Sequence, residues 1–183
     1  MIKGLFAKRE TKAVLFDLGD TLFVEEIADR PENQGKHIWE IEFEKVEGTD
    51  ELLRTLYGHY KMAVVTNTET SREPQVRIAL RKAKIEHFFD VVITSVDVGA
   101  PKPEAEICMK ALEALNAKPS EAVMIGNRLE IDISGARKLG IRTILLRRNE
   151  RYRGTPLTDE EKPDYVVKSL SEIPKILGGL RSC

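Results

Sequence analysis

The sequence predicts an α/β protein in which helices cover both faces of a mainly parallel sheet, a three-layer α/β/α sandwich. Short apolar runs recur along the chain, and such runs are typical of strands that are buried on both faces. Segments of helical periodicity separate these runs, and this alternation indicates parallel βαβ units. The 183 residues can bury roughly 70% of the unfolded surface, so the fold needs no disulfide or metal ion.

Six apolar runs are the candidate strands of this sheet. The first run, residues 13–16, reads Ala-Val-Leu-Phe and stops at Asp17. The other runs lie at 62–65, 91–93, 122–125 and 143–146, with a weaker one at 165–167.

Four segments between the runs carry apolar residues at helical spacing. These segments are residues 50–60, 74–84, 103–116 and 129–139. Pro103 suits the first turn of a helix, and Gly140 suits the left-handed position that ends one.

Residues 37–46 do not follow this alternation. Their apolar side chains, Trp39, Ile41 and Phe43, alternate with three glutamates, and this period of two predicts a half-exposed strand. With residues 22–24 the strand would form a hairpin or flap directly after the first strand. An ordinary edge strand with Trp39 packed inside explains the pattern equally well.

The domain prediction follows from the length of the chain. We expect one domain over residues 1–183, with a flap or minimal cap at about 22–46. The stretch between Asp17 and Thr66 is too short for a large helical cap once the helix at 50–60 is assigned.

Composition limits the partners and the location of the protein. The formal net charge is −1, so we expect no global attraction to nucleic acid or to an anionic membrane. The two cysteines, Cys108 and Cys183, indicate no disulfide framework. Residues 1–12 lack the apolar stretch of a signal peptide, and no run approaches the roughly 18 apolar residues of a membrane helix. These features predict a cytoplasmic protein.

Polar side chains follow the apolar runs where parallel sheets bind ligands, beyond the carboxyl ends of the strands. Asp17 follows the first run, Thr66 and Asn67 follow the second, and Lys102 lies between two prolines after the third. The fourth run continues into Gly-Asn-Arg-Leu-Glu-Ile-Asp at 126–132. We expect all of these groups at one edge of the sheet.

This set of groups suits phosphoryl transfer. Asp17 is a candidate carboxylate nucleophile that would form an aspartyl-phosphate. The Thr66 hydroxyl would donate to a phosphate oxygen, and Lys102 would supply the charge that lets Asp17 and a phosphate approach each other. A magnesium ion held by Asp17 and the 127–132 loop would orient the phosphate.

Each of these residues alone also has a structural explanation. An aspartate after a strand is usually a turn residue, and a threonine there is commonly structural. Pro-Lys-Pro is commonly a rigid surface loop, and Asp132 would be an ordinary exposed residue early in a helix. The four residues come in this order at the ends of successive strands, and this order favours an active site over four separate structural roles.

With these residues in place, the sequence resembles the haloacid dehalogenase-like hydrolase superfamily. The matching segments are residues 16–22, 64–67 and 102–103, and Gly126-Asn127 followed by Asp132, within a region from 13 to about 146. The resemblance implies a Rossmann-like fold and most often a magnesium-dependent phosphatase. It implies Asp17, Thr66 and Lys102 as catalytic residues, with Thr66, Asn67 and Lys102 binding substrate. It also implies Asp17, the Gly19 carbonyl, Asn127 and Asp132 as metal ligands.

Two departures from the family pattern point to weaker chemistry. The family's second aspartate, the general acid, would stand two residues after the nucleophile, where this chain has Gly19. We therefore expect that Asp20 partly substitutes, that the substrates have good leaving groups, or that catalysis has been lost. Asn127 stands where the family has an acidic ligand, so magnesium affinity should fall.

Several functions and partners therefore stay open. The first is a phosphatase acting on a phosphorylated substrate of unknown size. The second is a phosphate- or metabolite-binding protein that has lost turnover, and the third is a dehalogenase, which would need an enclosing cap. Four arginines at 147–153 are most simply part of a solvated loop and are the only feature that suggests nucleic acid. A homo-oligomer that supplies a lid is a further alternative.

Overall fold

The protein is described by a computed structural model covering residues 10–149, 151–152 and 154–181. Predictions about residues 1–9, Arg153 and Cys183 lie outside these described residues. One six-stranded sheet organises the chain, in the order β3-β2-β1-β4-β5-β6, and every neighbouring pair is parallel. Its strands are β1 (Ala13–Phe16), β2 (Lys61–Thr66), β3 (Val91–Thr94), β4 (Ala122–Gly126), β5 (Arg142–Leu146) and β6 (Tyr165–Val167). All six predicted strands are confirmed.

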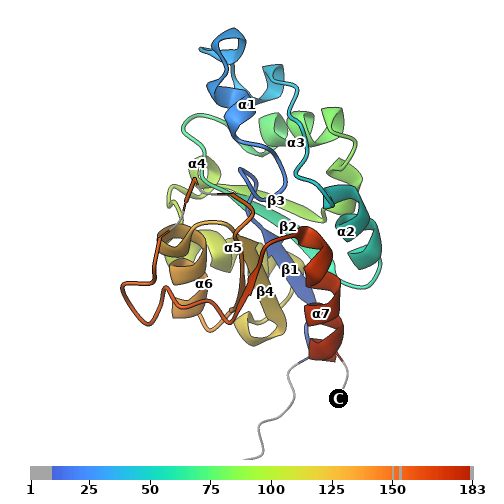
Figure 1. Ribbon diagram of the computed structural model, residues 1–183, viewed down its shortest axis with the longest axis vertical. Coiled ribbons are helices and arrows are strands. Elements are labelled where there is room, and N and C mark those ends of the chain that lie inside the picture. The colour runs from blue at the N-terminus through green and yellow to red at the C-terminus, as the bar shows by residue number, and fades with distance from the viewer. Residues whose placement is uncertain (1–9, 150, 153, 182–183) are drawn as a thin grey trace, which may run out of the picture.

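Helices cover both faces of the sheet, which confirms the three-layer fold class. One face packs against α2 (Thr49–Leu56), α3 (Glu73–Lys82) and α7 (Ile173–Arg181). The other packs against α5 (Ala105–Leu115) and α6 (Ser134–Lys138). Figure 1 shows α2 and α7 on one side of the strands and α6 on the other.

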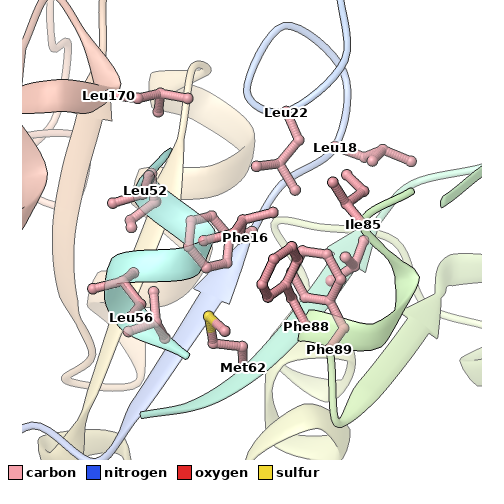
Figure 2. Packing of buried hydrophobic residues seen from close by; sticks show 14 of the residues in the cluster. Phe16, Leu18, Leu22, Leu52, Leu56, Met62, Ile85, Phe88, Phe89 and Leu170 are labelled. Atoms are coloured by element: carbon pink, nitrogen blue, oxygen red, sulfur yellow. The ribbon is translucent and has the colours of Figure 1, made fainter. Parts of the chain in front are cut away.

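The core is divided between the two faces because side chains alternate along each strand. In β1, Val14 and Phe16 join the cluster under α2, α3 and α7, whereas Ala13 and Leu15 join the cluster under α5. The ring of Phe16 meets Phe89 edge-to-face, with centroids 6.0 Å apart, in the packing shown in Figure 2. The aliphatic content of both faces explains why β1 reads as a continuous apolar run.

Helix boundaries differ from the prediction in two places that matter for the site. Pro103 is not in the first turn of a helix, because α5 begins at Ala105 and the Lys102–Pro103 peptide bond is cis. The predicted helix at 129–139 is divided into a π-helical turn, Leu129–Ile133, and the short α6. Gly140 has a φ of +78°, as expected for a residue that ends a helix.

Three further helices had not been predicted. The helices α1 (Glu26–Asp29) and α4 (Ser95–Val98) are single turns, too short for a periodic pattern. The helix α7 buries Ile173 and Leu177 against the cluster below α2. Its sequence contains Pro174 and two glycines, and such residues weaken a helical pattern in the sequence alone.

The predicted strand at 37–46 is wrong, and residues 22–46, called the flap below, have a different backbone. Only its end pairs with residues 22–24: Val24 N–H donates to the Glu44 carbonyl and Val46 N–H donates to the Leu22 carbonyl, both at 2.9 Å. Between these two edges the chain forms α1 and two 3₁₀ turns, Pro31–Asn33 and Ile38–Glu40. Residues 37–43 therefore have no partner strand, and their alternation has another cause.

That cause is packing against the rest of the flap. Ile41 is buried, and the ring of Phe43 stacks on Phe23 with centroids 5.0 Å apart. Trp39 is only half-buried and stacks on His37 at 4.3 Å, so it does not pack inside an edge strand. In Figure 1 the flap around α1 projects from one end of the molecule.

Among the described residues, every helix is too short or too polar to cross a membrane.

Candidate active site

Asp17 lies at the carboxyl end of β1, where the chain leaves the sheet. Its N–H donates to the Ile125 carbonyl at 2.9 Å, which extends the register with β4 by one residue. The following loop winds tightly, because the carbonyl of Leu18 accepts the N–H groups of Leu22 and Phe23. This turn brings the Thr21 hydroxyl back to donate to Asp17 Oδ2 at 3.1 Å.

Lys102 neutralises Asp17 in the interior of the protein. Its Nζ donates to Asp17 Oδ1 at 2.6 Å and to Asp132 Oδ1 at 2.7 Å, and its side chain is 2% exposed. Burial alone would lower the pKa of this ammonium, but the two carboxylates outweigh burial and raise the pKa above its usual value. The lysine is therefore a permanent cation between two acids.

Asn67 fixes the backbone that carries this lysine. The Lys102 N–H donates to Asn67 Oδ1 at 2.8 Å, and Asn67 Nδ2 donates to the Lys102 carbonyl at 2.9 Å. The sequence predicted that Asn67 binds substrate. In the structure its side-chain amide ties the end of β2 to the segment after β3, while Asn67 also lines the cavity, so that binding of substrate stays a prediction.

Asp132 reaches the site because of the π-helical turn. This turn closes back on Arg128, whose carbonyl accepts the N–H of Asp132 at 2.9 Å. Asp132 Oδ2 then accepts the N–H groups of Asn127 at 3.1 Å and of Arg128 at 3.0 Å. Its other oxygen accepts from Lys102, so Asp132 shapes the loop and balances the lysine, and its part as a metal ligand stays a prediction.

Burial of the Asp132 carboxyl group shifts its pKa. Desolvation, followed by the charge of Asp17, raises the pKa of Asp132 to about 6, against the lowering effect of Lys102. The three charged groups therefore form one electrostatic unit with a single cation for two acids.

Gly126 is required by the close approach of Asp132. A Cβ at this position would lie 2.5 Å from the Cβ, Cγ and Oδ2 of Asp132. That side chain cannot move aside, because three hydrogen bonds hold it. We expect Gly126→Ala to lower the free energy of unfolding by about 1–3 kcal/mol, the usual range for overpacking, when measured by urea denaturation.

A matched control for this prediction is Gly179→Ala in α7. Its Cβ meets nothing within 4 Å, and alanine is favoured over glycine inside a helix. This variant should be as stable as the parent or slightly more stable. A Gly126→Ala protein with the stability of the parent would show that the loop can relax around Asp132.

Three oxygen-bearing groups converge beside Asp17 and fit a divalent cation. The end of the Asn127 amide lies about 3.3 Å from both the Gly19 carbonyl and Asp17 Oδ2: its nitrogen would donate to both, and its oxygen, turned the same way, adds a third oxygen to the group. Asp17, Gly19 and Asn127 thus offer a carboxylate, a carbonyl and an amide oxygen within one cluster. Magnesium prefers oxygen ligands of this kind, so the residues present fit the predicted ion.

These groups form the floor of a cavity of about 660 Å³ between the sheet edge and the flap. Thr66, buried at the end of β2, lines the same cavity, and its bond to phosphate stays a prediction. The flap contributes apolar lining residues, Phe23, Ile38, Ile41 and Phe43, together with the polar Glu25, Lys36 and His37. The cavity is therefore lined by charged groups at the sheet edge and by both apolar and polar side chains on the flap side.

Asp20 is placed differently from the prediction. Its φ of +52° turns the residue away from the cavity lining, and Oδ1 accepts a hydrogen bond from Arg148 Nη2. The same oxygen accepts the N–H of Glu25 at 3.1 Å. An aspartate held by an arginine and a backbone amide does not face Asp17 as a substitute general acid.

Arg148, Arg151 and Tyr152, in the predicted solvated loop, make specific contacts with the flap and the turn after β1. Arg148 contacts the buried Asp20, and Arg151 Nη2 donates to Asp29 Oδ2 at 2.7 Å. Tyr152 OH donates to Glu25 Oε2 at 2.8 Å. The segment after β5 thus holds the flap to the sheet, and two of its arginines are already paired with carboxylates.

Sequence reasoning missed Thr21, Glu25 and Tyr152. Thr21 lies in the segment 16–22 that carries the family resemblance. Its position four residues after Asp17, in a tight turn, could have indicated the contact between the two side chains. The contact between Glu25 and Tyr152 joins residues 127 positions apart, and nothing in the local pattern indicates it.

A buried carboxylate paired with a lysine, at the carboxyl edge of a parallel sheet and below a small flap, suits a hydrolase that reacts through an aspartate on a three-layer α/β/α fold. The sequence model of the haloacid dehalogenase-like hydrolase family matches residues 7–146, most of the chain. The chain belongs to this family.

The curated relatives include pyrophosphatases named PpaX. The protein from Bacillus mycoides strain KBAB4 is 37% identical over 118 residues, which are 64% of this chain and 52% of that protein. The protein from Bacillus cereus strain B4264 is 35% identical over 138 residues, 75% and 61% of the two chains. This chain spans about half to three-fifths of the length of these relatives.

Solved structures agree with the fold. The HAD phosphatase from Thermococcus onnurineus aligns with a TM-score of 0.74 and 28% identity, over 94% of this chain and 100% of that one. The L-2-haloacid dehalogenase from Xanthobacter autotrophicus aligns with a TM-score of 0.73 at 17% identity, over 92% and 99% of the chains. The second likeness concerns the fold alone.

Proposed function

We propose that this protein is a magnesium-dependent phosphatase that hydrolyses phosphate monoesters through an aspartyl-phosphate on Asp17. The observation that carries the proposal is the buried array in which Lys102 Nζ lies 2.6 Å from Asp17 and 2.7 Å from Asp132, at the floor of a cavity. Membership of the hydrolase family supports it. So do the pyrophosphatase and phosphatase names of the relatives from Bacillus and Thermococcus.

Asp17 is the nucleophile in this proposal. The ammonium of Lys102 and the hydroxyl of Thr21 hold it as an oriented carboxylate. One of its oxygens attacks phosphorus, and the bond from phosphorus to the leaving oxygen breaks. Water then attacks the aspartyl-phosphate, which releases inorganic phosphate and restores the carboxylate.

Charge compensation is the second requirement of this chemistry. A dianionic phosphate can approach the anionic Asp17 only where positive charge is already in place. Lys102 supplies one such charge, and Thr66 would donate to a nonbridging oxygen. A bound magnesium ion would supply two further charges and would be held by Asp17, the Gly19 carbonyl and Asn127.

Asn127 makes this metal site weaker than one with an acidic ligand at that position. We expect Asn127→Asp to lower the magnesium concentration at half-saturation about tenfold, because ligand charge sets the affinity of such sites. The readout is the magnesium-dependent rise in melting temperature, which requires no turnover. Without magnesium the variant should melt lower than the parent, because the new carboxylate faces Asp17. A half-saturation that does not change would place the ion elsewhere.

The assay that tests the function uses p-nitrophenyl phosphate and acetyl phosphate, each with magnesium and with EDTA. Both substrates have good leaving groups, so the glycine at position 19 does not hide turnover. Magnesium-dependent hydrolysis supports the proposal. If neither compound is hydrolysed but inorganic phosphate raises the melting temperature, the protein binds phosphate and has lost turnover. Chloride release from 2-chloropropionate in EDTA would instead indicate a dehalogenase.

A further inference from the structure

A glutamate from the flap occupies the space beside the nucleophile loop that Gly19 leaves open. An ideal Cβ built on Gly19 would lie 3.4 Å from Cδ and 3.5 Å from Oε1 of Glu25. Glu25 immediately precedes α1 and lines the same cavity as Asp17. Its carboxyl group therefore lies where a side chain from position 19 would extend.

The carboxyl group is held in one orientation by the segment after β5. Tyr152 OH donates to Oε2 at 2.8 Å, and Arg151 Nε lies 3.8 Å from the same oxygen. The ring of Tyr152 is fixed in turn by the guanidinium of Arg128, 4.7 Å from its centroid. These contacts reach Oε2, whereas Oε1 is directed toward Gly19.

The other carboxylates near the site bind other groups or lie farther from the nucleophile loop. Both oxygens of Asp132 accept hydrogen bonds from Lys102 and from the loop after β4. Asp20 contacts Arg148 and lies outside the cavity lining. Glu69 lines the cavity as an exposed residue beyond β2, away from the turn that carries Asp17.

We propose that Glu25 is the general acid and base of the reaction. The inference rests on the proposed phosphatase function. When Asp17 attacks phosphorus, the electron pair of the breaking bond passes to the leaving oxygen, which takes the proton from the Glu25 carboxyl. The resulting carboxylate then removes a proton from the water that attacks the aspartyl-phosphate, and Glu25 is protonated again. One proton is given and one is taken in each cycle.

The test varies the leaving group while the shape of the substrate stays nearly constant. p-Nitrophenol leaves readily without a proton, whereas phenol, a much weaker acid, needs one. We expect Glu25→Gln to slow phenyl phosphate hydrolysis by about 10²-fold or more and p-nitrophenyl phosphate hydrolysis by less than about threefold. The matched control is Glu26→Gln, the same change at the exposed neighbour on α1, which should leave both rates unchanged.

A second pair of variants tests the geometry. Gly19 does not adopt the left-handed conformation, so a side chain is allowed there once Glu25 is shortened. Glu25→Ala should lose phenyl phosphate hydrolysis, and Gly19→Asp in the Glu25→Ala background should restore it at least tenfold. A carboxyl group returned to the same space from the other chain segment would explain this recovery, whereas a merely structural role of Glu25 would not.

The outcomes separate this inference from the proposed function. A parent protein that hydrolyses neither ester overturns both. A parent that hydrolyses both esters, with equal losses on each in Glu25→Gln, overturns the role of Glu25 and leaves Asp17 as the nucleophile. Absence of recovery with Gly19→Asp, in a protein that melts like the parent, also overturns it.

Discussion

Asp17→Asn should slow p-nitrophenyl phosphate hydrolysis by about 10⁴-fold or more, as expected when a covalent nucleophile is removed. An amide cannot displace the leaving oxygen and form the phosphorylated intermediate. Incubation with beryllofluoride, which binds a free aspartate in place of phosphate, should protect the parent against heat and leave the variant unprotected. Steady-state rates and melting curves measure both effects.

The same substitution should not destabilise the fold, which makes the loss of activity interpretable. Asp17 is one of two buried acids that share Lys102, and its charge helps to raise the pKa of Asp132. Without that charge Lys102 keeps one partner and the repulsion disappears. The free energy of unfolding at neutral pH should therefore be equal or higher. Retained turnover would show that Asp17 is not the nucleophile.

Lys102→Met should have the largest effect on stability, about 3–5 kcal/mol, because it leaves two buried carboxylates without their cation. Its effect should also depend on pH. Asp132 already has a folded pKa of about 6, above the ordinary value of 3.8, and removal of the ammonium raises it further. A carboxyl whose pKa is raised by folding stabilises the protein at low pH and loses this contribution as the pH rises through the folded pKa.

The loss caused by Lys102→Met should therefore be larger at about pH 8 than at about pH 5 in urea denaturation. Lys110→Met is the control, because Lys110 pairs with Glu113 on the exposed side of α5 and should show little change at either pH. Asp17→Asn added to Lys102→Met should recover part of the stability. An equal loss at both pH values would contradict buried carboxylate repulsion as its cause.

The fold was predictable because its strands are buried on both faces. Residues 13–16 and 122–125 read as continuous apolar runs, and the first polar residue beyond each run, Asp17 or Asn127, marks the carboxyl edge. The flap was not predictable to the same extent. Its apolar residues pack on one another, as Phe43 does on Phe23, and such packing can mimic the alternation of a strand.

The site was predictable where a residue lies at the end of a strand or in the loop beyond it. Asp17, Thr66 and Lys102 meet around one cavity because parallel strands end at the same edge. The contacts of the neighbouring residues Asp132 and Asp20 were harder to predict from the sequence. A π-helical turn decides that Asp132 faces backbone amides, and a positive φ decides that Asp20 turns toward Arg148. Neither backbone feature leaves a distinct pattern in the sequence.

The contacts between the segment after β5 and the residues that follow β1 have a consequence for engineering. Arg148 contacts Asp20, Arg151 contacts Asp29, and Tyr152 contacts Glu25. The flap is continuous with β1 and α2, and these contacts connect it to a third point, beyond β5. Residues 22–46 transplanted alone into a relative would arrive without the partners that orient Glu25. A functional exchange of substrate pockets must therefore move two separate segments together, the flap and the segment at 147–154.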